Sequence, residues 1–311
     1  SRLREQGVDL SGLEDRMIAL ENLSKEISWM RKLRAAVMAR LAAGSLRNAE
    51  VSETAAILFT SGSESRPKAV PLSQKNILAN IADVCALQVA RRDDRLISIL
   101  PPFHSFGLTV GMALPLSTNL PAVHHPNPNQ APMLARIIET YGVTLMIGTP
   151  TFLSGILRAA HEGQIDSLRF AVTGAEKCPK RVYDAFARAC PKAELLEGYG
   201  VTECSPIISV NRPENPKPET IGKVLDSFEY AIVDVDSGEP AEKGRPGMLL
   251  VRGPCVFDGY IGQEVASPFV EHDGRTWYRT GDLVSEDEDG VLTFAGRLKR
   301  FVKLGGEMIS L

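Results

Sequence analysis

The sequence contains few cysteines and little net charge. Its five cysteines are spread over 311 residues, and none forms a Cys-x-x-Cys pair, which argues against a disulfide framework and against a zinc site. This cysteine usage fits a reducing cytoplasm best. A net charge of -3 gives the chain no general basic field, so nucleic acid is not an expected partner.

Long hydrophobic runs and clustered metal ligands are also lacking. The most apolar long stretch, residues 107–123, is interrupted by Pro115, Asn119 and Pro121 and is too short to span a bilayer. The pair His124-His125 has no carboxylate or cysteine at ligand spacing and indicates a loop rather than a metal site. The chain begins with Ser and shows no signal peptide, and we interpret it as a portion of a longer protein.

What the sequence does contain, 44% hydrophobic and 23% charged residues, is typical of a folded chain with two or three cores. Between residues 54 and 198, apolar runs alternate with helical patterns. The predicted strands are residues 55–59, 95–100, 143–147, 168–173 and 193–196. The predicted helices are residues 74–90, 107–117, 131–141, 150–161 and 179–190. This alternation predicts an α/β fold, a parallel sheet with helices on both faces, that binds ligands at the carboxyl ends of its strands.

The loop at residues 60–70 follows the first predicted strand, residues 55–59, which we expect to be buried. It offers hydroxyl donors, a glycine that allows close backbone approach, and one positive charge. These groups are Thr60, Ser61, Gly62, Ser63 and Lys68. They suit a phosphate, although their spacing is not that of a Walker A motif. On composition alone, an ordinary Ser- and Gly-rich turn without a ligand is the alternative.

The regions before and after this α/β part have different sequence patterns. Residues 24–43 predict an amphipathic helix with Ser24 as its N-cap. Its apolar residues are Ile27, Met30, Leu33, Val37 and Leu41, and its basic residues are Arg31, Lys32, Arg34 and Arg40. The basic face suits anionic lipid or an acidic carrier protein, and a solvated face on a helix packed against its own domain is the alternative. After the Pro-rich residues 211–218, short strand-like runs with turns predict a small β-rich subdomain.

Three further segments follow the loop in a fixed order: residues 197–203 (EGYGVTE), 277–282 (WYRTGD) and 296–306 (GRLKRFVKLGG). Together with TSGS…PK, this order resembles the adenylate-forming superfamily of acyl and aryl ligases. The strings ILFTSGSE, LPPFHSFGLTVG, VTGAEK and LEGYGVTECSP are most similar to bacterial acyl-[acyl-carrier-protein] synthetases. Those proteins are often fused as the synthetase part of 2-acylglycerophosphoethanolamine acyltransferase. The resemblance covers nearly the whole chain after Glu53.

The resemblance implies that ATP and Mg²⁺ activate a long-chain fatty acid as an acyl-adenylate, with loss of pyrophosphate. The acyl group then passes to the phosphopantetheine thiol of acyl-carrier protein, in phospholipid acyl recycling. Acyl-CoA ligase, with CoA as the acceptor, is the nearest alternative, and a non-catalytic nucleotide- or acyl-binding fragment is another. Lysophospholipid and a membrane surface are partners implied through regions outside this chain. The implied location is cytoplasmic, or peripheral on the cytoplasmic face of the inner membrane.

At the phosphate end of ATP, the resemblance implies that loop residues 60–68 bind the β- and γ-phosphates. Thr202 would donate its hydroxyl to a phosphate oxygen. Glu203 would bind a Mg²⁺ ion that bridges phosphates, because this hard cation prefers carboxylate oxygens. Without the resemblance, Glu203 would be interpreted as an exposed acid.

At the nucleoside end, the implied binding residues are Gly174, Ala175, Glu176, Tyr199, Gly200, Asp282 and Arg297. Tyr199 would stack on adenine, and core packing is its alternative. Asp282 would accept hydrogen bonds from both ribose hydroxyls with help from Arg297, although alone it is typical of a turn. His104, after the second predicted strand, would orient the fatty carboxylate, with a structural histidine as the alternative.

The resemblance divides the chain into a helical lead-in (1–52), an α/β nucleotide- and acyl-binding subdomain (53–210), a β-rich subdomain (211–298) and a hinge with the start of a lid (299–311). Lys299 occupies the hinge position. Two departures from the family pattern are evident. Ser65 and Ala69 stand where the phosphate loop usually has glycine, which would strain any position with positive φ. The family's catalytic lysine belongs to the lid beyond Leu311, so we expect this chain alone to adenylate poorly.

Overall fold

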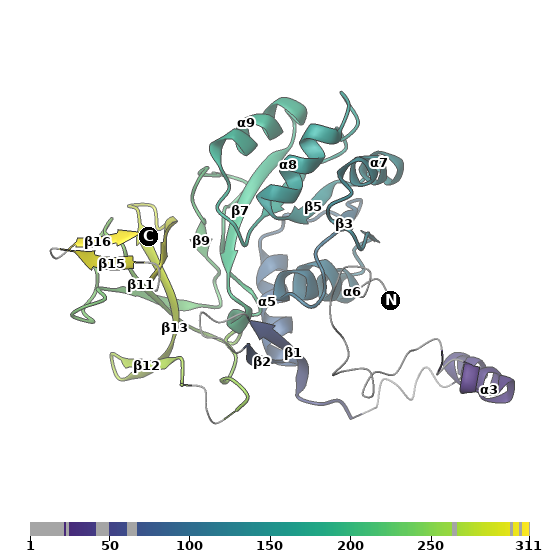
Figure 1. The fold of residues 1–311 in the computed structure, drawn as a ribbon, viewed down its shortest axis with the longest axis horizontal. Coiled ribbons are helices and arrows are strands. Elements are labelled where there is room, and N and C mark those ends of the chain that lie inside the picture. Colours follow the sequence, from purple (N-terminus) through teal and green to yellow (C-terminus); the bar gives the residue numbers. More distant parts are fainter. Residues whose placement is uncertain are drawn as a thin grey trace. The chain divides into compact units, whose positions relative to one another are not determined.

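The computed structural model (Figure 1) describes residues 22, 25–41, 50–60, 67–262 and 266–298, and the backbone of 301–304 and 307–310. The chain forms two compact units, Ser1–Ser52 and Glu53–Leu311. Within these described ranges, no helix is both long enough and apolar enough to cross a membrane.

The first unit contains the helix α3 (Trp29–Leu41), none of whose residues is buried. It begins after Ser28, whose hydroxyl accepts a hydrogen bond from the backbone N–H of Arg31 at 3.4 Å. The predicted N-cap, Ser24, lies outside the described residues. The helix carries four basic and no acidic side chains, and its apolar residues, including Trp29 at 72% exposure, face solvent in this unit.

The second unit is built on a seven-stranded sheet with the order β4-β3-β5-β6-β7-β8-β9. Its strands are β3 (Leu96–Ser98), β4 (Ala122–His124), β5 (Leu145–Gly148), β6 (Phe170–Thr173), β7 (Glu194–Gly200), β8 (Ile207–Val210) and β9 (Lys223–Val224). Pairing is parallel from β4 to β7 and antiparallel from β7 to β9. The predicted α/β fold is confirmed. The sequence analysis did not predict β4 or the antiparallel edge strands β8 and β9, because strands of two to four residues are too short to show a periodic pattern.

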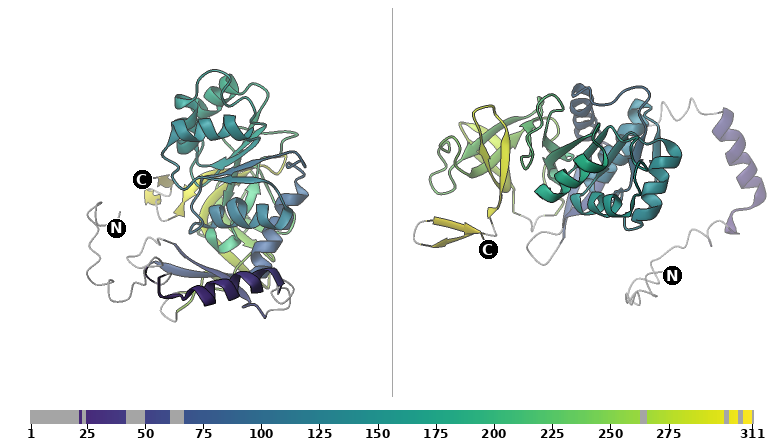
Figure 2. Two further views of the ribbon diagram at one scale, coloured as in Figure 1. Left: turned by 90° about the vertical axis from the view of Figure 1, so that its right-hand side faces the viewer. Right: turned by 90° about the horizontal axis from the view of Figure 1, so that it is seen from above.

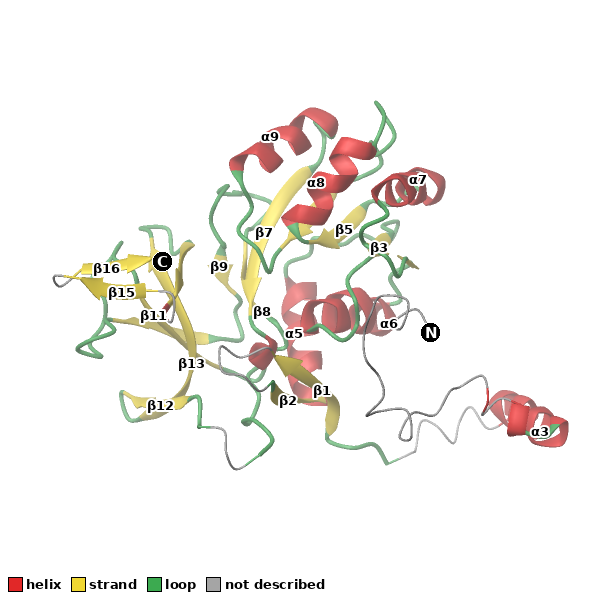
Figure 3. Cartoon of the chain, viewed as in Figure 1, coloured by secondary structure: helices red, strands yellow, loops and turns green. Residues whose placement is uncertain are grey.

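Helices cover both faces of this sheet. They are α5 (Gln74–Ala86), the π-helix η2 (Gly107–Ala113), α6 (Leu114–Thr118), α7 (Ala131–Tyr141), α8 (Pro150–Ala159) and α9 (Lys180–Ala189). Leu96 packs with α5, η2 and α6, whereas its neighbour Ile97 packs with α7, α8 and α9. Adjacent strand residues point to opposite faces, so the apolar runs supply two cores. Figure 3 shows the helices around this sheet.

The first predicted strand proves to be half of a hairpin rather than part of the parallel sheet. β1 (Thr54–Thr60) pairs antiparallel with β2 (Lys68–Ser73) in a separate two-stranded sheet. The seven residues between these strands are too few for the crossover that parallel pairing needs. The expectation that residues 55–59 are buried was also wrong, because Leu58 is buried but Phe59 is 67% exposed.

The β-rich sheet has the order β10-β11-β13-β12, with β14 paired to β13. Its strands are β10 (Glu229–Val233), β11 (Gly247–Arg252), β12 (Phe269–His272), β13 (Arg275–Glu286) and β14 (Leu292–Arg297). A separate hairpin joins β15 (Phe301–Leu304) to β16 (Glu307–Ser310). The β-rich sheet lies beside the α/β part in the right-hand view of Figure 2, and Leu249 and Val284 share a core with Leu196 of β7.

Candidate functional site

Polar segments meet at the carboxyl ends of the parallel strands. β7 leads into the short 3₁₀ helix η3 (Thr202–Cys204), and β3 leads into the loop that carries Ser105. The hydroxyl oxygens of Ser105 and Thr202 lie 3.2 Å apart, so the loops after these two strands touch, as parallel pairing predicts. Gly200 lets the chain pass close to Pro206 just before β8, because a Cβ atom at Gly200 would lie 1.9 Å from the carbonyl oxygen of Pro206.

Glu203 is a buried carboxylate with 7% exposure. The hydroxyl of Tyr260 donates a hydrogen bond to Glu203 Oε1 at 2.7 Å. The ammonium of Lys68 lies 4.9 Å from the centre of the Tyr260 ring, which makes a cation–π contact. Burial and the nearby Glu203 carboxylate raise the pKa of Tyr260 above its usual value, so Tyr260 keeps its proton and acts as a donor. Sequence reasoning missed Tyr260.

Asp282 lies at the boundary between the α/β part and the β-rich sheet and is 1% exposed. The hydroxyl of Tyr199 donates to Asp282 Oδ2 at 2.6 Å. Arg297 Nε lies 3.1 Å from Oδ1, as expected for residues paired in register on β13 and β14. Among the described residues, Oδ1 has no hydrogen-bond donor of good geometry. A buried acceptor of this kind can receive a ligand hydroxyl.

Burial dominates the electrostatics of Asp282. It raises the pKa of this carboxyl above the usual value, while the Tyr199 hydrogen bond and the Arg297 charge oppose the rise. The nearby carboxylate of Glu203 raises the pKa further. The two buried acids therefore lie close enough to interact, in one cluster.

The loop between β6 and α9 carries Gly174, Ala175 and Glu176. An added Cβ at Gly174 would lie 3.1 Å from the carbonyl oxygen of Gly198, so this loop passes close to β7. Ala175 has a left-handed φ of 66°, which is uncommon for a residue with a side chain. The Glu176 carboxylate accepts a hydrogen bond from the Thr151 hydroxyl at 2.6 Å. The structure therefore brings this loop beside β7, the strand that carries Tyr199.

Glu197 fixes the other end of that loop. It is buried, and it accepts hydrogen bonds from the Cys178 N–H at 3.1 Å and from the Tyr183 hydroxyl at 2.9 Å. Burial raises the pKa of Glu197, and these two hydrogen bonds oppose the rise. Sequence reasoning gave Glu197 no role of its own; a lone acid at the end of an apolar strand was the only available signal.

For the remaining predicted residues the structure shows fewer contacts, or they lie outside its described part. Thr60 and Lys68 face each other in register at the ends of β1 and β2. His104 is exposed, with its ring centre 4.7 Å from that of Phe103, and its side chain has no contact with the two buried acids among the described interactions. Four predicted residues lie outside the described part of the chain: Ser61, Gly62, Ser63 and Lys299.

The residues present fit a magnesium nucleotide. In the part of the chain that the structure describes, no group of three His, Cys, Asp or Glu side chains could hold a metal ion. A Mg²⁺ ion carried by nucleotide phosphates needs only one or two protein carboxylates. Glu203 supplies one such carboxylate, already oriented, and Asp282 presents a buried acceptor suited to a hydroxyl of the sugar.

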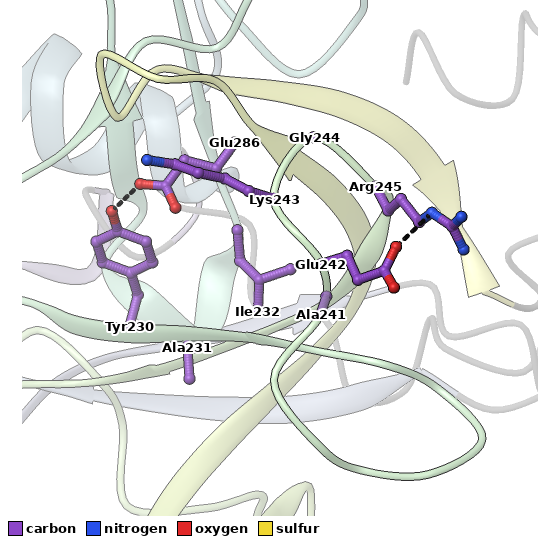
Figure 4. Close-up of a pocket in the computed structure, with 9 residues that line it drawn as sticks. All are labelled: Tyr230, Ala231, Ile232, Ala241, Glu242, Lys243, Gly244, Arg245 and Glu286. Carbon is purple, nitrogen blue, oxygen red and sulfur yellow. Dashed lines mark hydrogen bonds and ion pairs between the residues drawn. The ribbon is translucent and has the colours of Figure 1, made fainter.

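A separate pocket of about 360 Å³ lies in the β-rich sheet (Figure 4) and contains none of the predicted site residues. On its wall the Tyr230 hydroxyl donates to Glu286 Oε1 at 2.6 Å. Burial raises the pKa of Tyr230 to about 12. Arg245 and Glu242 form an ion pair at 2.8 Å, and both are largely exposed.

Comparison with known proteins gives consistent results. Residues 12–261 match the family model described as AMP-binding enzyme. A long-chain-fatty-acid–CoA ligase of Yersinia pestis is 32% identical over 264 residues, which cover 82% of this chain and 46% of the relative. The 4-coumarate–CoA ligase-like 9 of Arabidopsis thaliana is 32% identical over 261 residues, covering 81% of this chain and 46% of the relative.

A similar solved structure is O-succinylbenzoate coenzyme A synthetase of Bacillus subtilis in complex with ATP and a magnesium ion. It has a TM-score of 0.74 and 25% identity, and the match covers 84% of this chain and 55% of that one. The chain thus spans about half the length of the relatives that it matches.

Proposed function

The chain belongs to the AMP-binding enzyme family, and from this premise we propose that it takes part in activating a long-chain fatty acid with ATP. The observation that carries the proposal is the pair of buried acids, Glu203 and Asp282, each of which accepts a hydrogen bond from a tyrosine hydroxyl. Burying a carboxylate costs free energy, and a buried acid whose pKa is raised, as that of Asp282 is, is typical of a functional site.

In the proposed reaction, a carboxylate oxygen of the fatty acid attacks the α-phosphorus of ATP. The bond to the β-phosphate breaks, and pyrophosphate leaves with the electron pair. The protein positions the reactants and stabilises the negative charge of the transition state. Mg²⁺, when bound, supplies charge neutralisation at the phosphate oxygens.

We assign the residues as follows. Glu203 holds the cation, Thr202 donates to a phosphate oxygen, and Lys68 faces the phosphates with the loop residues 61–63. Asp282 accepts a ribose hydroxyl, supported by Arg297. Tyr199 lies beside adenine, together with Gly200 and the loop that carries Gly174, Ala175 and Glu176. His104 orients the fatty carboxylate, and Lys299 is the hinge between a large domain (subdomains 53–210 and 211–298) and a lid.

The thiol acceptor that the relatives favour is CoA, because both relatives described above are named CoA ligases. Acyl-carrier protein is the second candidate. It is supported by the strings HSFGLTVG and LEGYGVTECSP and by the basic side chains of α3, which suit an acidic partner. With the carrier as acceptor, phospholipid acyl recycling at the inner membrane is the setting, and lysophospholipid is the eventual acceptor.

Hydroxylamine trapping tests the proposal. The full-length native protein, given ATP, Mg²⁺ and palmitate, should form palmitoyl hydroxamate, and omission of any one of the three should abolish it. Absence of hydroxamate under all conditions would contradict the proposed activation step.

A competition between CoA and acyl-carrier protein then identifies the acceptor. Preferential acyl-CoA formation at low salt supports CoA. Preferential acyl-carrier formation that declines with added salt supports the carrier, because salt screens fields beyond about 8 to 10 Å. In that case, reversal of Arg31, Lys32 and Arg34 to Glu should lower carrier turnover and leave adenylation unchanged.

A further inference from the structure

The segment between β11 and β12 contacts both parts of the proposed phosphate site. We name residues 254–261 the bridging segment. Its backbone donates to the carbonyl oxygen of Glu203 from Phe257 N–H at 2.9 Å, and to that of Ala69 on β2 from Ile261 N–H at 3.0 Å. The buried side chain of Asn76 donates to the carbonyls of Pro254 and Val256. The bridging segment is therefore fixed on three sides.

Tyr260 is the side chain of this segment that reaches the site. Its hydroxyl donates to Glu203 Oε1 at 2.7 Å, while its ring faces the Lys68 ammonium at 4.9 Å. The Phe257 ring packs edge-on against it, with 5.0 Å between the ring centres. The Tyr260 side chain thus contacts both the Glu203 carboxylate and the Lys68 ammonium, the two charged side chains that we assign to binding the magnesium nucleotide.

The chemistry of this contact favours an orienting role. A carboxylate at the end of a Glu side chain rotates freely unless a partner fixes it, and a fixed ligand loses less entropy when the cation binds. The Tyr260 bond engages Oε1, and Oε2 is the oxygen that we assign to the cation. A hydrogen-bonded partner that orients a metal ligand commonly affects metal affinity by 10-fold or more.

We propose that Tyr260 is a positioning residue that holds Glu203 in the orientation required by the magnesium nucleotide. This inference rests on the proposed function, because it takes Glu203 as the ligand for the cation. Tyr260 touches neither the cation nor the reacting atoms. It acts through Glu203 and, by its ring, on the placement of Lys68.

The test variant is Tyr260→Phe, which removes the hydroxyl and keeps the ring that packs on Phe257 and faces Lys68. The matched control is Tyr230→Phe, which removes a hydroxyl bonded to Glu286 in the pocket of the β-rich sheet. We expect Tyr260→Phe to raise the Mg²⁺ concentration for half-maximal adenylation roughly 10-fold. The rate at saturating Mg²⁺ should stay within about 3-fold of the wild type, and Tyr230→Phe should change neither.

A binding measurement without turnover gives the second readout. Electron paramagnetic resonance of Mn²⁺ titrated with ATP into the native full-length protein should show the same weakening for Tyr260→Phe. In the Glu203→Gln background, Tyr260→Phe should have no further effect on Mn²⁺ binding, because the two side chains act as one unit.

Unchanged Mn²⁺-ATP binding in Tyr260→Phe would overturn the inference. An equal loss in Tyr230→Phe would also overturn it, because the effect would then follow from loss of any part-buried hydroxyl. If the wild type forms no hydroxamate, the proposed function fails, and the Mn²⁺-ATP comparison still decides whether Tyr260 orients Glu203.

Discussion

Two Tyr–Glu pairs of this chain have similar geometry and different surroundings. Tyr260 donates to Glu203 at 2.7 Å and Tyr230 donates to Glu286 at 2.6 Å. Glu203 is buried just after β7, and the site has a second buried acid, Asp282 of β13, whereas Glu286 is half-buried on the wall of an open pocket. The pocket at Tyr230 and the buried acids Glu203 and Asp282 therefore lie in different parts of the molecule.

This difference bears on how a site is located in a structure. A large pocket is the usual first candidate for a binding site, but none of the charged side chains that line the pocket at Tyr230 is buried. Glu203 and Asp282 are buried acids that accept hydrogen bonds from tyrosines of distant segments, and the pKa of Asp282 is raised, a feature that marks functional sites better than pocket volume does. Matched changes at the two pairs should therefore differ in their effect on activity, with a loss at Glu203 and little change at Glu286.

The largest expected effect is that of Glu203→Gln. The amide keeps the shape of the side chain and loses the charge that binds a hard cation, so fatty-acid-dependent adenylation should fall about 100-fold, the size of losing one charge-stabilising group. Pyrophosphate exchange measures this rate. The matched change Glu286→Gln should leave the exchange rate within about 2-fold, and equal losses in both variants would show that the two glutamates do not differ in their role.

Asp282→Ala should weaken ATP binding more than it slows the chemical step. Hydrogen bonds to a charged acceptor contribute about 1.5–3 kcal/mol, which corresponds to roughly a 10- to 100-fold rise in the KM for ATP. Steady-state kinetics at saturating fatty acid separates KM from kcat. An unchanged KM for ATP in this variant would show that Asp282 does not bind the nucleotide.

The stability of Asp282→Asn should depend on pH in a defined direction. Burial raises the pKa of Asp282 above its ordinary 3.8, so the folded protein binds this proton more tightly than the unfolded chain. Wild-type stability is then lost as pH rises from about 3.8 through the folded-state pKa. Asparagine does not titrate, so urea denaturation should find Asp282→Asn more stable than wild type at pH 7, with the gap closing toward pH 4. A gap that widens toward low pH would contradict the assigned shift.

Tyr230→Phe should have the smallest effect on activity. It removes one hydrogen bond on the pocket wall, so unfolding free energy should fall by about 1 kcal/mol while adenylation is unchanged. Thermal denaturation and pyrophosphate exchange on the same preparation measure both quantities. A selective loss of activity would place the pocket of Figure 4 in the reaction.

The α/β fold was predictable because its strands and helices repeat at periods that a sequence shows. Strands such as β5 and β6, and helices such as α7 and α8, lie within or close to their predicted ranges. The β1–β2 hairpin was not predicted, because the apolar residues 55–59 suggest a buried strand and residues 60–70 suggest a loop. Its strand character depends on Val70 and Leu72, which are fully buried, and that burial is a property of the folded chain.

The site was predictable only where one segment carries several polar groups in a row. Thr202 and Glu203 follow a strand directly, and Asp282 is found through the resemblance. Tyr260 is 57 residues from Glu203, in a segment without a regular period, so no local pattern could pair them. Contacts between distant segments are created by folding, and a single sequence does not show them.

Pyrophosphate exchange with and without fatty acid tests the central claim most directly, that the buried acids rather than the pocket carry the chemistry. The account predicts ATP–pyrophosphate exchange in the native full-length protein that requires both fatty acid and Mg²⁺, is nearly abolished by Glu203→Gln, and persists in Glu286→Gln. Exchange that survives Glu203→Gln and is lost in Glu286→Gln would contradict it.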